Sequence, residues 1–312
     1  MTSMRILITG GAGCLGSNLI EYWLPQGHEI FVIDNFATGK REVLPPIAGL
    51  TVVEGSIANA ELVINCFEQF QPTHVIHSAA AYKNPHDWIE DTATNVLGTI
   101  NVAQASLTHE VKRFVNFQTA LCYGRPNQVP IPVNHPTAPF TSYGISKTAG
   151  ESYLMHSGLP IVSLRLANIC GPRLAIGPIP TFYKRLKAEQ NCFCSDTVRD
   201  FIDMSDFLLL IDKVVSDSTV NGVFNVSTGE GYSIKDVFET VAQYLMITPP
   251  NVPIMPVGAD DVPTVVLDPS QTEQMFGWKA QVSFPEIINR QLSWYDAHGV
   301  TDIYSHLVTP KS

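Results

Sequence analysis

The chain has 312 residues, a formal net charge of −10, 45% hydrophobic residues and 15% charged residues. This composition is typical of a folded globular protein and excludes a disordered one, and the length allows one extended domain or two. Basic residues come at most in pairs, so we expect neither nucleic acid nor an anionic membrane as a partner.

The sequence gives no sign of membrane insertion, secretion or a metal centre. No apolar run approaches membrane-spanning length, and the glycines near the N-terminus come too soon for the apolar core of a signal peptide. We therefore expect a cytoplasmic protein with reduced cysteines. The nearest cysteine pair, Cys192 and Cys194, has no second pair to complete a zinc site, so no metal is expected.

The first elements predict a dinucleotide-binding unit. An apolar strand over 5–9 runs into the glycine loop 10–16, and a helix follows. Glycines allow a tight turn and a close approach of the backbone to a pyrophosphate, while the helix N-terminus faces the anion. A second strand over 30–33 ends at Asp34, whose carboxylate can accept hydrogen bonds from the adenosine ribose, which favours NAD over a 2′-phosphorylated cofactor. The alternative is an ordinary glycine-rich turn and a solvated aspartate.

Alternation of strands and helices through about Arg165 predicts the fold class, an α/β protein with a mostly parallel, doubly wound sheet. Ligands then bind where the carboxyl ends of the strands meet. Strands are predicted near 5–9, 30–33, 51–53, 73–78, 113–118 and 160–165, and helices near 16–24, 58–69, 91–108 and 142–157.

Beyond Arg165 the sequence becomes richer in proline and glycine, and its elements become shorter. We predict an NAD-binding domain over 1–167, to which a helix and a strand return within about 203–226. Segments 168–202 and 227–312 are predicted to form a smaller, substrate-binding lobe.

Tyr143 and Lys147 predict acid–base chemistry. Four residues apart on a helix, they share a face, so the ammonium can favour the phenolate and lower a pKa that is ordinarily about 10. Thr119, at the end of a predicted strand, can donate its hydroxyl to the substrate oxygen that Tyr143 deprotonates. The alternatives are a chance pair on a solvated helix face and a threonine that bonds local backbone.

These motifs together resemble the extended short-chain dehydrogenase/reductase family. They are the loop Thr9 to Gly16, the triplet Asp34-Asn35-Phe36, Thr119, the run Tyr143 to Lys147, and the run Leu166 to Arg173. The similarity covers nearly the whole chain and is strongest to the NAD-dependent nucleotide-sugar epimerase/dehydratase branch. Within that branch, the chain is similar to epimerases of bacterial O-antigen and polysaccharide gene clusters.

The resemblance implies roles for particular residues. Catalytic roles fall to Thr119, Tyr143 and Lys147. Cofactor-binding roles fall to Gly10, Gly13, Cys14, Leu15, Gly16, Asp34, Asn35, Ser56, Ile57, Ala79, Ala80, Asn95, Tyr143 and Lys147. Substrate-binding roles fall to Asn168, Phe193, Arg199 and Val265.

Several of these assignments have alternatives. Asn95 could be a satisfied structural amide, Arg199 a surface partner of Asp200 or Asp203, and Val265 a core strand residue. The sequence also departs from the family at the nucleotide end of the substrate, because an arginine usual before Asp261 is absent.

The residues after Thr119 discriminate between the reactions of the branch, which all begin by removing hydride from the sugar, usually at C4. Dehydratases need an acid and a base there, but Ala120 and Leu121 can neither donate nor accept a proton. We therefore predict an NAD-dependent epimerase of a UDP-hexose derivative, possessing tightly bound, recycled NAD and a 4-keto intermediate. The substrate class includes 2-acetamido and uronic acid sugars, and the expected setting is bacterial lipopolysaccharide synthesis.

Two other functions stay open. A nucleotide-4-ketosugar reductase or dehydrogenase would exchange its cofactor, and a regulator would bind NAD without catalysis. The resemblance also implies a homodimer, formed through the helices near 91–108 and 142–157.

Overall fold

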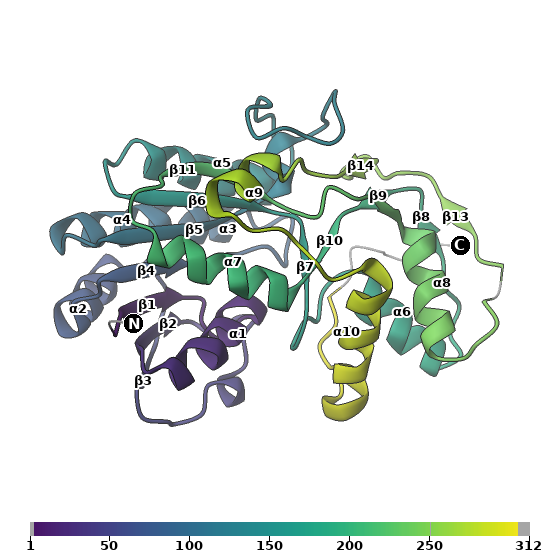
Figure 1. Cartoon of the computed structure of the whole chain (residues 1–312), viewed down its shortest axis with the longest axis horizontal. Helices are drawn as coiled ribbons and strands as arrows, with labels where there is room; N and C mark the ends of the chain where they lie inside the picture. The colour runs from purple at the N-terminus through teal and green to yellow at the C-terminus, as the bar shows by residue number, and fades with distance from the viewer. Residues whose placement is uncertain (1–2, 250, 305–312) are drawn as a thin grey trace.

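The computed structural model describes residues 3–249 and 251–304. Within them, seven parallel strands form one sheet in the order β11-β6-β5-β4-β1-β2-β3 (Figure 1). The strands are β1 (Arg5–Thr9), β2 (Glu29–Asp34), β3 (Leu50–Glu54), β4 (His74–His77), β5 (Arg113–Thr119), β6 (Ile161–Leu166) and β11 (Gly222–Val226). The order runs outward from β1 in both directions, so the prediction of a doubly wound parallel sheet is confirmed.

The central strands are largely buried because both faces of the sheet are covered. Along β1, Ile6 and Ile8 belong to the core under helices α1 (Cys14–Trp23) and α7 (Met204–Ser216), whereas Leu7 belongs to the core of the opposite face. Helices α2 (Ala60–Phe70), α4 (Thr99–Thr108) and α5 (Ser142–Met155) cover that opposite face. Side chains that alternate between two faces thus join two cores through one strand.

Short polar side chains begin several of these helices. Asn59 accepts a hydrogen bond from the Leu62 N–H at the start of α2, and Thr141 accepts one from the Gly144 N–H at the start of α5. Such caps satisfy backbone donors that have no partner inside the helix.

The helix predicted over 91–108 has three parts. An α-helical turn, α3 (Trp88–Thr92), leads into a π-helical turn, η3 (Ala93–Gly98), which continues as α4. A π-helical turn inside an α-helix commonly accompanies a functional site, and this one contains Asn95.

A second core lies to the right in Figure 1. Its largest helices are α6 (Pro178–Lys187), α8 (Ile234–Tyr244) and α10 (Phe284–His298). The short strands are β7 (Asn168–Cys170), β8 (Cys194–Ser195), β9 (Val198–Arg199), β10 (Phe201–Asp203), β12 (Tyr232–Ser233), β13 (Ile254–Met255) and β14 (Thr264–Val265), and helix α9 (Ser270–Phe276) packs against β11. The short 3₁₀ turns are η1 (Leu24–Gln26), η2 (Arg41–Val43) and η4 (Ala120–Tyr123). The predicted domain boundaries stay a prediction.

No helix in the described part of the chain combines the length and apolar character needed to cross a bilayer.

Candidate active site

The glycine loop joins β1 to the N-terminus of α1. Gly10 has a φ of 69°, and a Cβ there would lie 2.7 Å from the Ala79 backbone. A Cβ on Gly16 would lie 2.6 Å from the Gly11 Cα. Gly13 is the N-cap of α1 and provides no side-chain cap, so the helix N-terminus remains available to an anion. Side chains are therefore excluded where the backbone must approach a pyrophosphate.

Asp34 lies at the end of β2 with its carboxylate fixed by the backbone. One oxygen accepts from the Ala12 N–H and the other from the Phe36 N–H, each at 2.8 Å. Burial raises the pKa of Asp34, and these two hydrogen bonds oppose that increase. The loop and the carboxylate are thus one unit, and lone pairs remain for the hydroxyls of a ribose.

Lys147 is buried, with 3% of its surface exposed, on the face of α5 that contacts the sheet. Burial lowers its pKa from 10.5 to about 8, while the charge of Glu151 acts in the opposite direction. The Gln118 side chain donates to the Lys147 carbonyl at 2.9 Å and so ties α5 to β5. At pH 7 the ammonium is still the main form.

The pKa of Tyr143 is higher than the sequence predicts. We expected Lys147 to lower it, but burial raises it above its ordinary value, and Tyr82 and Asp91 raise it further. The predicted decrease is therefore wrong for the protein alone. Burial removes water from the phenolate and so disfavours the charged form, which is the largest cause of the increase.

Thr119 ends β5 and begins η4. Its hydroxyl oxygen accepts a hydrogen bond from the Leu121 N–H at 3.2 Å, which fits the alternative of a threonine that bonds local backbone. The hydroxyl proton remains available to a second acceptor. The first turn of α5 packs on this turn, because a Cβ on Gly144 would lie 3.1 Å from the Leu121 carbonyl oxygen. The structure therefore brings Thr119 and Tyr143 to neighbouring positions at the carboxyl edge of the sheet.

Asn95 is fully satisfied inside the protein. Its amide accepts from the Ala81 N–H and donates to the Ala81 carbonyl, both at 2.9 Å, and it donates to the Ser146 hydroxyl at 3.0 Å. These bonds fit the structural-amide alternative. They hold the loop of Ala79 and Ala80 against α5, next to Lys147.

The other predicted cofactor residues lie on the same edge. Asn35 and Ser56 each accept a local backbone hydrogen bond, and Ile57 is buried. Cys14 donates to the Pro172 carbonyl at 3.4 Å, and burial raises its pKa to about 12. Leu15 is partly buried beside the core under α1.

Arg199 pairs with neither Asp200 nor Asp203, the two partners that the alternative to substrate binding named. Its guanidinium pairs with Asp261 at 2.5 Å and donates to the Val262 carbonyl at 2.8 Å. The pairing with Asp200 or Asp203 is therefore wrong, because Asp200 accepts from Thr228 and Gly229 and Asp203 caps α7.

Three further residues were predicted to bind substrate, and their positions relative to β9 and Arg199 differ. Asn168 is exposed and donates to the Asp200 carbonyl at 2.9 Å, and Phe193 is buried under the guanidinium of Arg185. Val265 pairs with Arg199 across β14 and β9, but its side chain is buried in an apolar cluster. That burial fits the core alternative for Val265, and its role as a pocket wall stays a prediction.

Sequence reasoning missed a buried ionic network beneath Lys147. Glu151, one helical turn further along α5, pairs with Arg165 at 2.8 Å and accepts from Ser163 at 2.6 Å. A sequence signal for Glu151 was present, because Tyr143, Lys147 and Glu151 follow one another at four-residue spacing on one helix face.

Tyr82 was missed as well, although it directly follows Ala79, Ala80 and Ala81.

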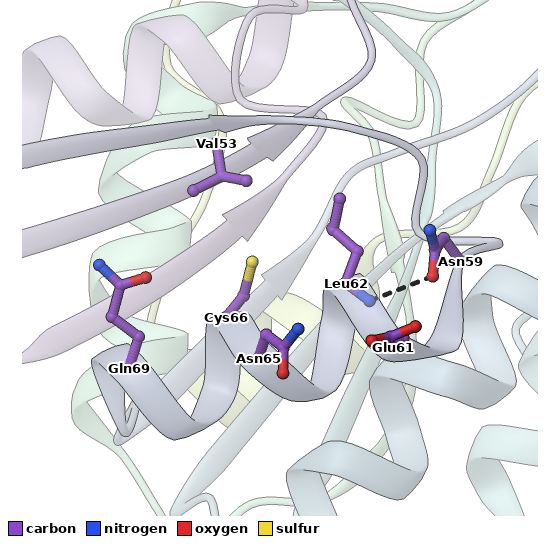
Figure 2. Close-up of a pocket in the computed structure, with 7 residues that line it drawn as sticks. All are labelled: Val53, Asn59, Glu61, Leu62, Asn65, Cys66 and Gln69. Carbon is purple, nitrogen blue, oxygen red and sulfur yellow. Dashed lines mark hydrogen bonds between the residues drawn. The ribbon is translucent and has the colours of Figure 1, made fainter.

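Two surface hollows lie away from these residues. Figure 2 shows one of them between Val53 of β3 and helix α2, lined by Asn65, Cys66 and Gln69 among others. The second lies between α6 and α10 and includes Tyr183 and Asp296. Neither contains a predicted site residue. In residues 3–249 and 251–304, no group of three His, Cys, Asp or Glu side chains is arranged to hold a metal ion.

Comparisons with known proteins fit this geometry. Residues 6–227 match the model of the NAD dependent epimerase/dehydratase family. The chain belongs to this family. The match confirms the predicted family, and it agrees with the predicted class of NAD-dependent epimerase.

Solved and curated relatives extend over almost the whole chain. The Bordetella bronchiseptica enzyme WbmG, crystallised with NAD and UDP, is 69% identical, with 98% of each chain covered and a TM-score of 0.94. WbmH of the same organism, crystallised with NAD⁺, is 41% identical over 95% of this chain and 100% of that one, with a TM-score of 0.90. A UDP-glucose 4-epimerase of Halalkalibacterium halodurans is 29% identical over 95% of this chain and 96% of its own.

NAD is therefore the cofactor, as predicted, and the site fits it. The glycine loop leaves no room for a Cβ where the pyrophosphate approaches, and Asp34 is an anchored acceptor for ribose hydroxyls.

Proposed function

We propose that this protein is an NAD-dependent 4-epimerase of a UDP-hexose derivative, acting through a 4-keto intermediate with its NAD retained and recycled. One observation carries the proposal. Thr119, Tyr143 and the buried Lys147 gather at the carboxyl edge of the sheet, while Ala120 and Leu121, which directly follow Thr119, offer no acid or base for elimination. The similarity to WbmG, crystallised with UDP, and to a UDP-glucose 4-epimerase supports the substrate class.

The chain's own groups divide the chemistry. NAD⁺, when bound, would supply the hydride acceptor and, once reduced, the hydride donor. The Tyr143 oxygen takes the proton of the sugar hydroxyl, the Lys147 ammonium stabilises the resulting phenolate, and the Thr119 hydroxyl donates to the same substrate oxygen. Burial, Tyr82 and Asp91 all raise the pKa of Tyr143. The positive charge of the occupied site must therefore lower this pKa before Tyr143 can take a proton.

The nucleotide end of the substrate would lie by Asn168 and Arg199. The Arg199 guanidinium would exchange its bonds to Asp261 for the diphosphate, which matches its planar, bidentate donor geometry. Phe193 and Val265 complete the proposed substrate set. The setting in bacterial polysaccharide synthesis and the cytoplasmic location belong to the same proposal.

A homodimer is the proposed assembly. Helices α3, α4 and α5 expose large apolar side chains, among them Ile89, Leu107, Ile145 and Tyr153. Exposed apolar groups that gather on neighbouring helices favour burial against a second copy.

A panel of UDP-sugars tests the function. Purified protein without added cofactor should convert UDP-glucose, UDP-N-acetylglucosamine or UDP-glucuronic acid to its C4 epimer, identified by nuclear magnetic resonance. The Tyr143→Phe variant should keep bound NAD but lose activity. Consumption of added NADH with a 4-ketosugar would instead indicate the reductase, and failure of every sugar to reduce bound NAD would indicate the regulator.

A further inference from the structure

The walls of the proposed cofactor cleft come from loops that follow several strands. One wall is the loop after β4, which contains Tyr82. The opposite wall is the loop after β7, which lies beside α1 because its Pro172 carbonyl accepts from Cys14 and, at 2.9 Å, from the Asn18 amide. The glycine loop contacts the first wall as well, since a Cβ on Gly10 would lie 2.7 Å from the Ala79 backbone, and it therefore lies between the two.

The end of the described chain joins these walls. We name residues 301–304 the C-terminal strap. The Tyr304 N–H donates to the Ala175 carbonyl at 2.9 Å, and the Gly177 N–H donates to the Tyr304 carbonyl at 3.2 Å, so the strap is fixed to the second wall. The Tyr304 ring packs edge to face against the ring of Tyr82, which belongs to the first wall, and the two ring centroids are 6.3 Å apart.

Tyr82 connects the strap to both ends of the cofactor site. Its ring lies edge to face against Tyr143, with centroids 6.2 Å apart, and the Thr38 side chain opposes the increase that burial causes in the pKa of the Tyr82 hydroxyl. Thr38 follows Asp34 in the loop after β2. Tyr82 thus extends from the catalytic tyrosine toward the loop of the ribose carboxylate.

An exposed ion pair provides the third attachment. Lys40, in the same loop as Thr38, pairs with Asp302 at 2.7 Å and donates to the Thr301 hydroxyl at 2.6 Å. Lys83, next to Tyr82, also favours the charged form of Asp302. Because Lys40 and Asp302 are well exposed, salt should weaken this attachment.

We propose that Tyr82 and the C-terminal strap form a bridge over the bound cofactor that slows its release, so that NAD stays bound between turnovers. The inference rests on the proposed function, which requires a retained NAD. The bridge is not part of the chemistry, and opening it should change cofactor release rather than the hydride step.

The test measures NADH dissociation. NADH-loaded protein is mixed with pyruvate and lactate dehydrogenase, which oxidise each NADH that leaves, and the loss of bound-NADH fluorescence gives the rate. Tyr304→Ala and Asp302→Lys should each release NADH about tenfold faster. Glu286→Lys, which breaks another exposed ion pair on α10, should match the wild type.

A charge exchange separates a specific bridge from general damage. Lys40→Asp combined with Asp302→Lys restores one of the two attractions at the strap and should recover part of the slow release. High salt should speed release from the wild type more than from Asp302→Lys. Release rates within twofold of wild type in both Tyr304→Ala and Asp302→Lys would overturn the bridge, whereas a wild-type protein that never binds NADH would overturn the proposed function itself.

Discussion

Burial controls the protonation of the two central site residues. Lys147 loses part of its basicity because water is removed, and Glu151 returns some of it. Tyr143 is held in its protonated form by the same effect. At the scale of single residues, the protein without ligands therefore contains a protonated Tyr143 and a charged Lys147. The proposed proton transfer depends on the occupied site.

The Glu151→Gln substitution tests the link between Lys147 and its buried neighbour. The negative charge of Glu151 raises the pKa of Lys147, so its removal should lower that pKa below about 8. The ammonium is lost as pH rises through its pKa, so the basic limb of the kcat/KM profile should move to lower pH. The Glu286→Gln variant, an exposed carboxylate on α10, is the control. An unchanged basic limb in Glu151→Gln would remove Lys147 titration from the rate.

At the scale of elements, His77 joins two strands and a helix. Its ring nitrogens bond the Thr9 and Thr99 hydroxyls, each at 2.9 Å, and its side chain is fully buried. Burial lowers its pKa from 6.5 to about 3. The unfolded chain gains a proton below pH 6.5 while the folded one does not, so stability present above pH 6.5 is lost as pH falls toward 3.

The His77→Gln variant should remove this contribution. Glutamine still bonds two hydroxyls but does not titrate, so its free energy of unfolding should fall less steeply between pH 6 and 4. The difference in slope should be about 1.4 kcal/mol per pH unit. Urea unfolding at several pH values measures both slopes, and the carboxylates and His74 contribute equally to each. Parallel slopes would mean that His77 is protonated in the folded protein.

Close packing between α5 and η3 gives a second element-scale prediction. A Cβ on Gly150 would lie 2.4 Å from the Asn95 carbonyl oxygen. Replacing glycine by alanine in a helix ordinarily stabilises by about 1 kcal/mol, but here the backbones must separate. We expect Gly150→Ala to lower the free energy of unfolding by about 1–3 kcal/mol. Ser152→Ala, at an exposed position of α5, should be close to neutral. Stabilisation by Gly150→Ala would contradict the tight contact.

The sequence could predict the sheet because its strands are short segments rich in apolar residues, and most of them are buried on both faces. The predicted strand over 5–9 coincides with β1, and the one over 30–33 lies within β2. Helix spacing could also group Tyr143 with Lys147. The sequence could not predict contacts between distant segments, since no local pattern links Arg199 to Asp261 or Tyr304 to Tyr82. The sequence predicts the wrong direction for the pKa of Tyr143, because the burial that raises it depends on the whole fold.

At the scale of the whole molecule, the proposed homodimer makes a direct prediction. Ile89 is 84% exposed, and Ile145 and Tyr153 are also exposed on the neighbouring helix α5. Ile145→Glu combined with Tyr153→Glu should shift the mass in solution, measured by light scattering, from dimer to monomer. Met246→Glu is the matched control, because Met246 is 93% exposed in the other lobe. A wild-type protein that is monomeric at all concentrations would contradict the assembly.

Isotope retention at the sugar carbon tests the central claim most directly. A UDP-hexose with deuterium at C4 is incubated with purified protein and no added cofactor, and the product is analysed by mass spectrometry and nuclear magnetic resonance. A hydride taken and returned within one site predicts a C4 epimer that keeps its deuterium over many turnovers. Loss of deuterium to solvent, or net oxidation of the sugar with no epimer formed, would contradict the proposed NAD-recycling epimerase.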